Sequence, residues 1–229
     1  TAWPTRHTFS RHHPAVARWC ADRLFRIGLK PTLVPYETPR PGRVARCLNV
    51  VAEIPAARKP ARTTLVCAHF DSRQQRLEDP EAPAPGANDN ATGVAVLLEC
   101  ARLLVTHDEP RRDILRFVLF SGEEEGLLGS RAYAGVATHR DGLRCVFNLD
   151  QIGFPPPDRA IFVDRDEDGR DGNDAASAAM VARVQRLARD VVKVPTRVDP
   201  AEGSDYIPFA RHGVPIVGLY EAGKNYPHY

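Results

Sequence analysis

Residues 120–130 read FSGEEEGLLGS and follow a hydrophobic run, 114–119, that is typical of a buried strand. Three carboxylates therefore stand where a strand ends and a Gly-rich turn begins. In open α/β sheets, ligands bind at this edge. Three adjacent acids repel one another, so we expect a positive partner, and a metal ion favours ionised carboxylates. The sequence therefore predicts a metal site at the end of this strand.

On either side of this stretch, strand-like runs alternate with helical ones. The pattern predicts helices over 14–27, 91–105, 126–136, 174–192 and 204–211. It predicts strands over 47–54, 63–68, 114–120, 145–149, 161–163 and 216–219, with a loop over 73–87. Such alternation favours an α/β three-layer sandwich, in which a mostly parallel central sheet carries helices on both faces. No low-complexity linker divides the chain, so we expect one domain over residues 1–229.

The composition is that of an ordinary globular chain of 229 residues, 43% hydrophobic and 26% charged. The formal net charge of +2 gives no electrostatic reason to expect a nucleic acid or membrane partner. No apolar run approaches the ~20 residues of a membrane span. The five cysteines form no CxxC pair, and most lie in apolar segments, which favours buried free thiols.

Four clusters of acidic residues or histidine lie after a predicted strand or before a predicted helix. They are CAHFDS at 67–72, PGANDNATG at 85–93, Glu123 with Glu124, and FNLD at 147–150. Parallel strands bring their carboxyl ends to one edge, so the four clusters can converge in space. One imidazole and several carboxylates form a ligand set that zinc accepts. Two metals held ~3.5–4 Å apart by a bridging carboxylate would explain the number of acids.

Two further roles follow from the positions of neighbouring acids. Asp71 stands two residues after His69, where its carboxylate could accept the second ring N–H and fix the tautomer. Of Glu123 and Glu124, one can bind the metal while the other stays free as a general base.

Simpler interpretations exist for single members of the set. His69 alone would be a structural histidine, Asp89 could cap the helix that begins at Ala91, and Asp150 could form a turn. Four clusters together favour metal ligation for all three. Glu125 is expected to be solvated. The histidines outside the clusters are interpreted as surface or packing residues: His7, His12, His13, His107, His139 and His212.

Residues 164–169, DRDEDG, match the start of a calcium loop, with Asp at positions one, three and five and Gly at six. Position twelve is Ala175, where that loop needs a bidentate glutamate. An acidic turn leading into the helix at Asp174 is therefore the better interpretation.

The four clusters, in this order and spacing, resemble the family 28 metallopeptidases, the cocatalytic-zinc aminopeptidases with glutaminyl cyclase and glutamate carboxypeptidase relatives. NVVAEI at 49–54 and GSDYIPFARHGVPIVGLYE at 203–221 fit as well, so the resemblance covers nearly the whole chain. It implies the sandwich fold of zinc-dependent exopeptidases.

The resemblance also implies roles for six residues. His69 and Asp150 would hold one zinc, Asp89 would bridge two zinc ions, and Glu124 would hold the second. Glu123 would be the general base and Asp71 the partner of the His69 ring. In this family the peptide bond after the bridging Asp is often cis, which here is Asp89–Asn90.

The family's second zinc usually takes a histidine from a motif like Tyr-Pro-x-Tyr-His. This chain ends Tyr226-Pro227-His228-Tyr229, so His228 is out of register with that motif. We therefore expect an incomplete second metal site and a domain that lacks its C-terminal end.

The function that the resemblance implies is a zinc-dependent exopeptidase, an aminopeptidase that acts on peptides with a free N-terminus through a metal-bound water. Gln151, Ile152 and Phe154 follow a ligand strand and are candidates for lining its specificity pocket. Two alternatives stay open: a glutaminyl-peptide cyclotransferase with one zinc, and a non-catalytic binding domain on a peptidase scaffold. The resemblance slightly favours a secreted or periplasmic location, and the sequence does not decide the compartment.

Overall fold

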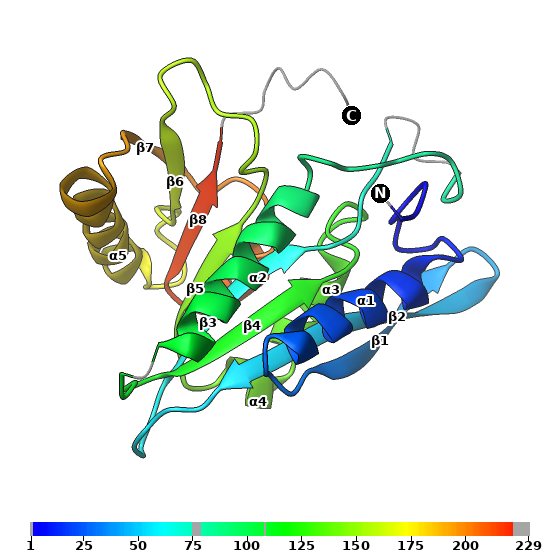
Figure 1. Cartoon of the computed structure of the whole chain (residues 1–229), viewed down its shortest axis with the longest axis horizontal. Coiled ribbons are helices and arrows are strands. Elements are labelled where there is room, and N and C mark those ends of the chain that lie inside the picture. The colour runs from blue at the N-terminus through cyan, green and yellow to red at the C-terminus, as the bar shows by residue number, and fades with distance from the viewer. Residues whose placement is uncertain (1, 75–78, 108, 222–229) are drawn as a thin grey trace.

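The computed structural model describes residues 2–74, 79–107 and 109–221, and its centre is an eight-stranded sheet (Figure 1). Across the sheet the strands run in the order β1-β2-β4-β3-β5-β8-β6-β7. In chain order they are β1 (Thr32–Arg40), β2 (Arg43–Ile54), β3 (Thr63–His69), β4 (Ile114–Phe120), β5 (Leu143–Leu149), β6 (Ile161–Arg165), β7 (Thr196–Pro200) and β8 (Ile216–Tyr220).

The middle of the sheet is parallel. Strand β3 pairs in parallel with both β4 and β5, and β5 pairs in parallel with β8. The pairs β1–β2, β2–β4 and β6–β8 are antiparallel, and β6–β7 is parallel. Because β4, β3, β5 and β8 point the same way, their carboxyl ends meet at one edge, as the sequence predicts.

Helices cover both faces of the sheet. They are α1 (His13–Arg26), α2 (Ala91–Thr106), α3 (Leu128–Gly135), α4 (Ala137–Arg140), α5 (Asp174–Leu187), the π-helical turn η1 (Ala188–Val192) and α6 (Ile207–Ala210). In Figure 1, α1 and α2 lie in front of the sheet, and α5 lies beside β6 at the left.

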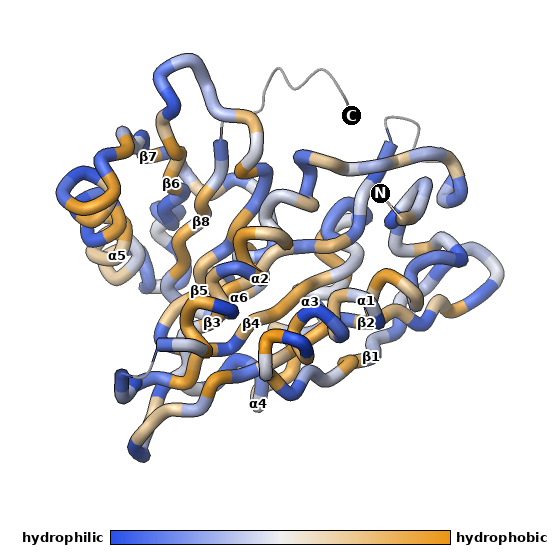
Figure 2. The backbone as a smooth tube through the Cα atoms, in the orientation of Figure 1, coloured by the Kyte–Doolittle hydropathy of each residue, from blue (hydrophilic) through white to orange (hydrophobic). Residues whose placement is uncertain are grey.

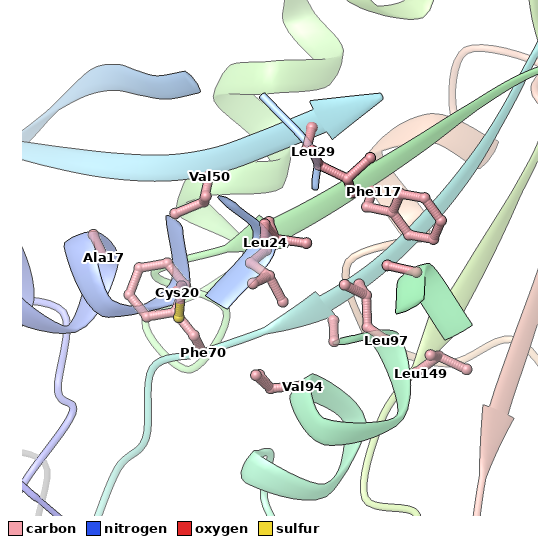
Figure 3. Packing of buried hydrophobic residues seen from close by; sticks show 14 of the residues in the cluster. Ala17, Cys20, Leu24, Leu29, Val50, Phe70, Val94, Leu97, Phe117 and Leu149 are labelled. Carbon is pink, nitrogen blue, oxygen red and sulfur yellow. The ribbon is translucent and has the colours of Figure 1, made fainter. Parts of the chain in front are cut away.

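Alternation along β4 explains the three layers. Phe117 and Leu119 pack with α1 and α2, while Val118 and Phe120 pack with α3 and α6. Successive side chains of a strand point to opposite faces, so a strand covered on both sides is a continuous hydrophobic run. Figure 2 shows this run as largely orange central strands, and Figure 3 shows Leu24 of α1 and Leu97 of α2 gathered with Phe117 in the first of these cores. The predicted three-layer sandwich is confirmed.

The sequence pattern does not predict two of the strands, β1 and β7. They are edge strands, and most of their side chains are exposed or half-buried, so they carry no hydrophobic run. Two predicted helices are shorter than expected. Helix α3 begins at Leu128, after the turn that holds Glu123 to Leu127, and α6 covers only four residues of 204–211.

The five cysteines are free thiols, of which four are buried and Cys100 is half-buried, as expected. None of the helices in the described residues combines the length and the apolar character needed to cross a bilayer.

Candidate metal centre

Three predicted ligands meet at the carboxyl edge of the sheet. His69 is the last residue of β3, Asp150 directly follows β5, and Asp89 lies in the turn before α2. The parallel pairing of β3 with β5 places the first two on adjacent strand ends. Each of the three residues offers one ligand atom, and these atoms all lie within 4.8 Å of one another. We call this group the His69 centre.

The two carboxylates of the His69 centre face the same ring nitrogen. His69 Nε2 lies 3.1 Å from Asp89 Oδ1 and 3.3 Å from Asp150 Oδ1. Asp89 Oδ1 is buried, yet it accepts no hydrogen bond from any described residue. Burial without a hydrogen bond is unfavourable for a carboxylate, and a cation shared with Asp150 would satisfy Asp89 Oδ1. This arrangement fits a divalent metal bound between the three side chains.

Asp71 holds the other side of the imidazole. Its Oδ1 lies 3.4 Å from His69 Nδ1, and its Oδ2 accepts a hydrogen bond from the Glu124 backbone N–H at 3.2 Å. Burial by itself favours the neutral acid, but the hydrogen bond and charge of His69 lower the pKa of Asp71 below its ordinary value. An ionised partner at Nδ1 directs Nε2 toward the His69 centre.

The His69 ring is fully enclosed by protein. Burial by itself would lower its pKa, but the charges of Asp150 and Glu123, with hydrogen bonds to Asp150 and Asp71, raise the pKa well above its usual value. Without a metal, the imidazolium therefore neutralises the surrounding carboxylates. A zinc ion would take over this role and leave a neutral imidazole as ligand.

Glu123 lies beside the His69 centre in the turn after β4. Its Oε2 is 3.9 Å from His69 Nε2. Burial, together with the charges of Asp150 and Asp205, raises the pKa of Glu123 well above its ordinary value, against the opposing effect of His69. A carboxyl group this close to the metal position, but outside the three-residue group, has the placement expected of a proton acceptor.

Glu124 is also outside the three-residue group. Its Oε2 forms a 2.8 Å ion pair with Arg73 Nε, and its Oε1 is buried without a hydrogen-bond partner among the described residues. Burial and the charge of Asp89 raise the pKa of Glu124 to about 8. The Arg73 side chain is 44% exposed, so it can move away if a second cation takes its place. Residues 225–229, with His228, lie outside the described residues.

The turn before α2 positions Asp89. The Asp89–Asn90 peptide bond is cis, as the resemblance implies. Asn90 caps α2, because its Oδ1 accepts from the Gly93 N–H at 2.9 Å, so the alternative of capping by Asp89 is wrong. Any side chain on Gly93 would collide, since a Cβ there would lie 2.3 Å from Asn90 Oδ1. Gln151 Nε2 donates to Asp89 Oδ2 at 3.0 Å and fixes the carboxylate.

Sequence reasoning missed two residues that support Asp150. Ser204 Oγ donates to Asp150 Oδ2 at 2.7 Å, and Asn148 Nδ2 donates to Ser204 Oγ at 2.8 Å. Asp205 follows Ser204 and is completely buried, and burial raises its pKa to about 7. The signal in the sequence was a Ser-Asp pair at the start of an otherwise apolar segment, 206–210.

The N-terminal segment 5–8 folds back over the loops of the centre. Arg6 Nε donates to Phe70 O at 2.8 Å, and the Gly122 N–H donates to Thr8 Oγ1 at 2.8 Å. His7 Nε2 lies 3.1 Å from Glu125 Oε1, and the Glu125 side chain is only 14% exposed. The expectation that Glu125 is solvated is therefore wrong, because this segment covers it.

The calcium-like stretch is an acidic turn, as expected. Asp164 belongs to β6, and the Gly169 N–H donates to Asp174 Oδ2 at 3.1 Å, which joins the turn to the first residue of α5. Asp166, Asp168 and Asp174 approach one another, but these carboxylates already accept hydrogen bonds from the turn.

The raised pKa values predict how zinc and pH act together on stability. Between about pH 4.5 and 8 the folded metal-free chain keeps a proton on Glu124 that the unfolded chain has lost, so its stability falls as pH rises through this window. The raised pKa of Glu123 acts in the same direction. Zinc would displace these protons and would therefore bind better at higher pH. At a hundredfold excess of zinc over its Kd at pH 8, we expect a stabilisation of ~2.7 kcal/mol, or ~5–10 °C in Tm.

Differential scanning calorimetry of chelator-stripped protein, with and without zinc at pH 5.5 and 8, measures this effect. Magnesium serves as the control ion, because it prefers all-oxygen octahedral sites. Equal zinc shifts at both pH values would contradict the protonation of the centre.

Comparison with known proteins agrees with this geometry. The family model described as "Peptidase family M28" matches residues 49–229. A "Probable zinc metalloprotease" of Leptosphaeria maculans is 31% identical over 175 residues, which are 68% of this chain and 39% of that protein. "Aminopeptidase YwaD" of Bacillus subtilis is 41% identical over 91 residues, 38% of this chain and 18% of that protein. The chain thus spans less than two fifths of these curated relatives.

Solved structures share the fold. The Legionella pneumophila LapA aminopeptidase matches with a TM-score of 0.76 at 18% identity, over 96% of this chain and 58% of that one. The Porphyromonas gingivalis glutaminyl cyclase matches with a TM-score of 0.72 at 19% identity, over 97% of this chain and 80% of that one. Peptidases and cyclases therefore share this backbone, and the side chains of the site must distinguish them.

Proposed function

This chain belongs to peptidase family M28, and we propose that it is a zinc-dependent aminopeptidase that removes N-terminal residues from peptides. The observation that carries the proposal is the His69 centre, with Glu123 Oε2 3.9 Å from the His69 ring. A metal-ligand group and a separate carboxyl group beside it are the two parts that metal-assisted hydrolysis needs.

Zinc, when bound, would supply a Lewis acid that polarises the substrate carbonyl and lowers the pKa of water. His69, Asp150 and Asp89 are the residues that we propose hold it. Glu124 would hold a second ion with Asp89 as the shared carboxylate. Asp71 keeps the His69 ring oriented through its 3.4 Å contact with Nδ1.

Glu123 is the proposed general base. It takes the proton of the attacking water and delivers it to the nitrogen of the leaving amine. Its raised pKa supports the first half of this role, because a buried carboxylate near other negative charges is a stronger base than an exposed one.

The excess of carboxylates supports cleavage at a free N-terminus. Asp89, Glu123 and Asp150 lie within 3.9 Å of the His69 ring nitrogen, and Glu124 follows Glu123 in the same turn, so carboxylate oxygens that a metal leaves free would accept hydrogen bonds from an ammonium group. A peptide with an acetylated N-terminus has no such ammonium group. We therefore expect it to be a poor substrate.

Zinc-loaded protein should hydrolyse aminoacyl p-nitroanilides and lose this activity on treatment with a chelator, with recovery on addition of zinc. The same amide with an acetylated N-terminus is the matched control substrate. Metal analysis of the same sample counts the zinc ions per chain and tests the second site.

Two results would contradict the proposal. Release of pyroglutamate from an N-terminal Gln peptide, without hydrolysis of any anilide, would favour the cyclotransferase alternative. Zinc binding without turnover of either substrate would favour a binding domain, although the six predicted site residues are all present.

A further inference from the structure

A cavity of about 460 Å³ opens beside the His69 centre. Asp150 and Ser204, which belong to the centre and its support, form one of its walls. Its other walls come from β6, the end of β7 with the segment that follows it, and the end of β8. A substrate bound at the His69 centre can therefore extend a side chain directly into this cavity.

Carboxylates dominate the lining of the cavity. Among the described residues that form it, five are acidic and none is lysine, arginine or histidine. The acids are Asp150, Asp164, Asp199, Glu202 and Glu221. The whole chain is close to neutral, so this concentration of one charge is local.

The inner part of the cavity holds a pair of aspartates, of which Asp164 is buried and Asp199 is half-buried. Asp164 on β6 stands opposite Asp199 on β7 in the parallel register. Tyr206 Oη donates to Asp164 Oδ2 at 2.7 Å, and Tyr220 Oη donates to Asp199 Oδ2 at 2.5 Å. Asp164 is only 9% exposed, whereas Glu202 is exposed. The pair therefore lies deeper than Glu202.

Gly218 of β8 makes room for the pair. A Cβ at this position would lie 2.5 Å from Asp164 Oδ2 and 2.7 Å from Tyr206 Cε1. Because Gly218 has no side chain, the side chains of Asp164 and Tyr206 can occupy the space that the side chain of another residue at this position would fill. Burial, with the charges of Asp199 and Asp150, raises the pKa of Asp164 to about 7 against the hydrogen bond from Tyr206.

We propose that this cavity receives the side chain of the substrate's N-terminal residue and selects the cationic side chains of arginine and lysine. The inference rests on the proposed aminopeptidase function, because the side chain next to the scissile bond is the one that reaches past Asp150. A guanidinium or ammonium group would neutralise Asp164 and Asp199, of which Asp164 is buried. The rings of Tyr206 and Tyr220 line the same cavity and are attractive to a cation.

The shape favours a long cation over a bare ammonium group. A volume of about 460 Å³ is within the range of pockets that enclose small ligands, and an α-ammonium group alone would leave most of it unfilled. Of the three residues that the sequence suggested for this pocket, Gln151 lines the cavity. Ile152 packs against the core of α1 and α2, and Phe154 is exposed and outside the lining.

The test compares arginyl, lysyl, leucyl and phenylalanyl p-nitroanilides on the zinc-loaded protein at pH 8. We expect kcat/KM for the two cationic substrates to exceed the others by ~10–100-fold, as for hydrogen bonds to charged groups. The double variant Asp164→Asn, Asp199→Asn should remove this preference, chiefly by raising KM for the arginyl and lysyl substrates. Asp158→Asn is the control, because Asp158 is exposed, pairs with Arg197 and lies outside the cavity.

The outcomes separate the two proposals. A preference for leucine or phenylalanine would overturn the selection of cations and leave the aminopeptidase function standing. Absence of hydrolysis with all four substrates would overturn the proposed function. Calorimetric titration with argininamide and leucinamide would then test whether the cavity selects cationic side chains. Tighter binding of argininamide that is lost in the double variant would support this selection. Equal binding of the two amides would overturn it.

Discussion

Replacing Glu123 with alanine should slow turnover by ~10²–10⁴ while zinc content stays nearly unchanged, because the change removes a proton carrier and not a ligand. Glu123 Oε2 is 3.9 Å from His69 Nε2 and outside the three-residue group that offers ligand atoms. Steady-state kinetics with a leucyl or arginyl anilide, together with metal analysis of the same preparation, measures both quantities. The loss should appear in kcat more than in KM, since the base acts on the reacting atoms.

Glu125→Gln is the matched control in the same turn. Burial and the charge of Asp71 raise the pKa of Glu125 to about 9, so the neutral amide closely resembles the native protonated acid. This variant should keep most of its activity and zinc. If instead Glu123→Ala lost zinc and activity together, Glu123 would be a ligand and its role would be exchanged with that of Glu124.

Replacing His69 with alanine should have the second large effect, the loss of zinc binding and with it of all activity. His69 supplies the nitrogen that lies within 3.3 Å of both Asp89 and Asp150. Without it only carboxylates remain, and the oxygen-only set suits magnesium or calcium better than zinc. Competition against a zinc-binding dye should show an affinity loss larger than the ~10–100-fold that is typical when an outer partner is removed.

The Asp71→Asn variant should show the smaller loss of zinc affinity that is expected for an outer partner of the ligand. Asp71 touches the far nitrogen of the same ring at 3.4 Å, so its loss should weaken zinc binding by ~10–100-fold without abolishing it. Thermal unfolding of both variants without metal controls for misfolding. Equal losses of zinc affinity in His69→Ala and Asp71→Asn would show that the two residues do not differ in role.

The parts of the centre that the sequence predicts are those set by local chain order. His69, Asp89, Glu123, Glu124 and Asp150 each stand within four residues of the end of a strand or the start of a helix. Buried parallel strands are continuous hydrophobic runs, so their ends are visible in the sequence. Because these strands are parallel, their carboxyl ends lie at the same edge of the sheet.

The parts that were missed depend on distant segments. Ser204 supports Asp150 across 54 positions of the chain, and His7 covers Glu125 from the N-terminal segment. The edge strands β1 and β7 carry few buried side chains and so leave no pattern.

The sequence alone determined that histidine or acidic residues stand at or just after the ends of β3, β4 and β5, because burial on both faces requires hydrophobic runs and the polar residues must follow them. Only the tertiary structure decided that Asp164 and Asp199 line one cavity next to Asp150. In the sequence Asp164 and Asp199 are 35 positions apart, and Asp164 stands at the start of a turn-like acidic stretch. Nothing in their local sequence distinguishes these two aspartates from acidic residues that are exposed to solvent. Charge acts through space, so the electrostatic character of the pocket exists only once β6, β7 and β8 are paired.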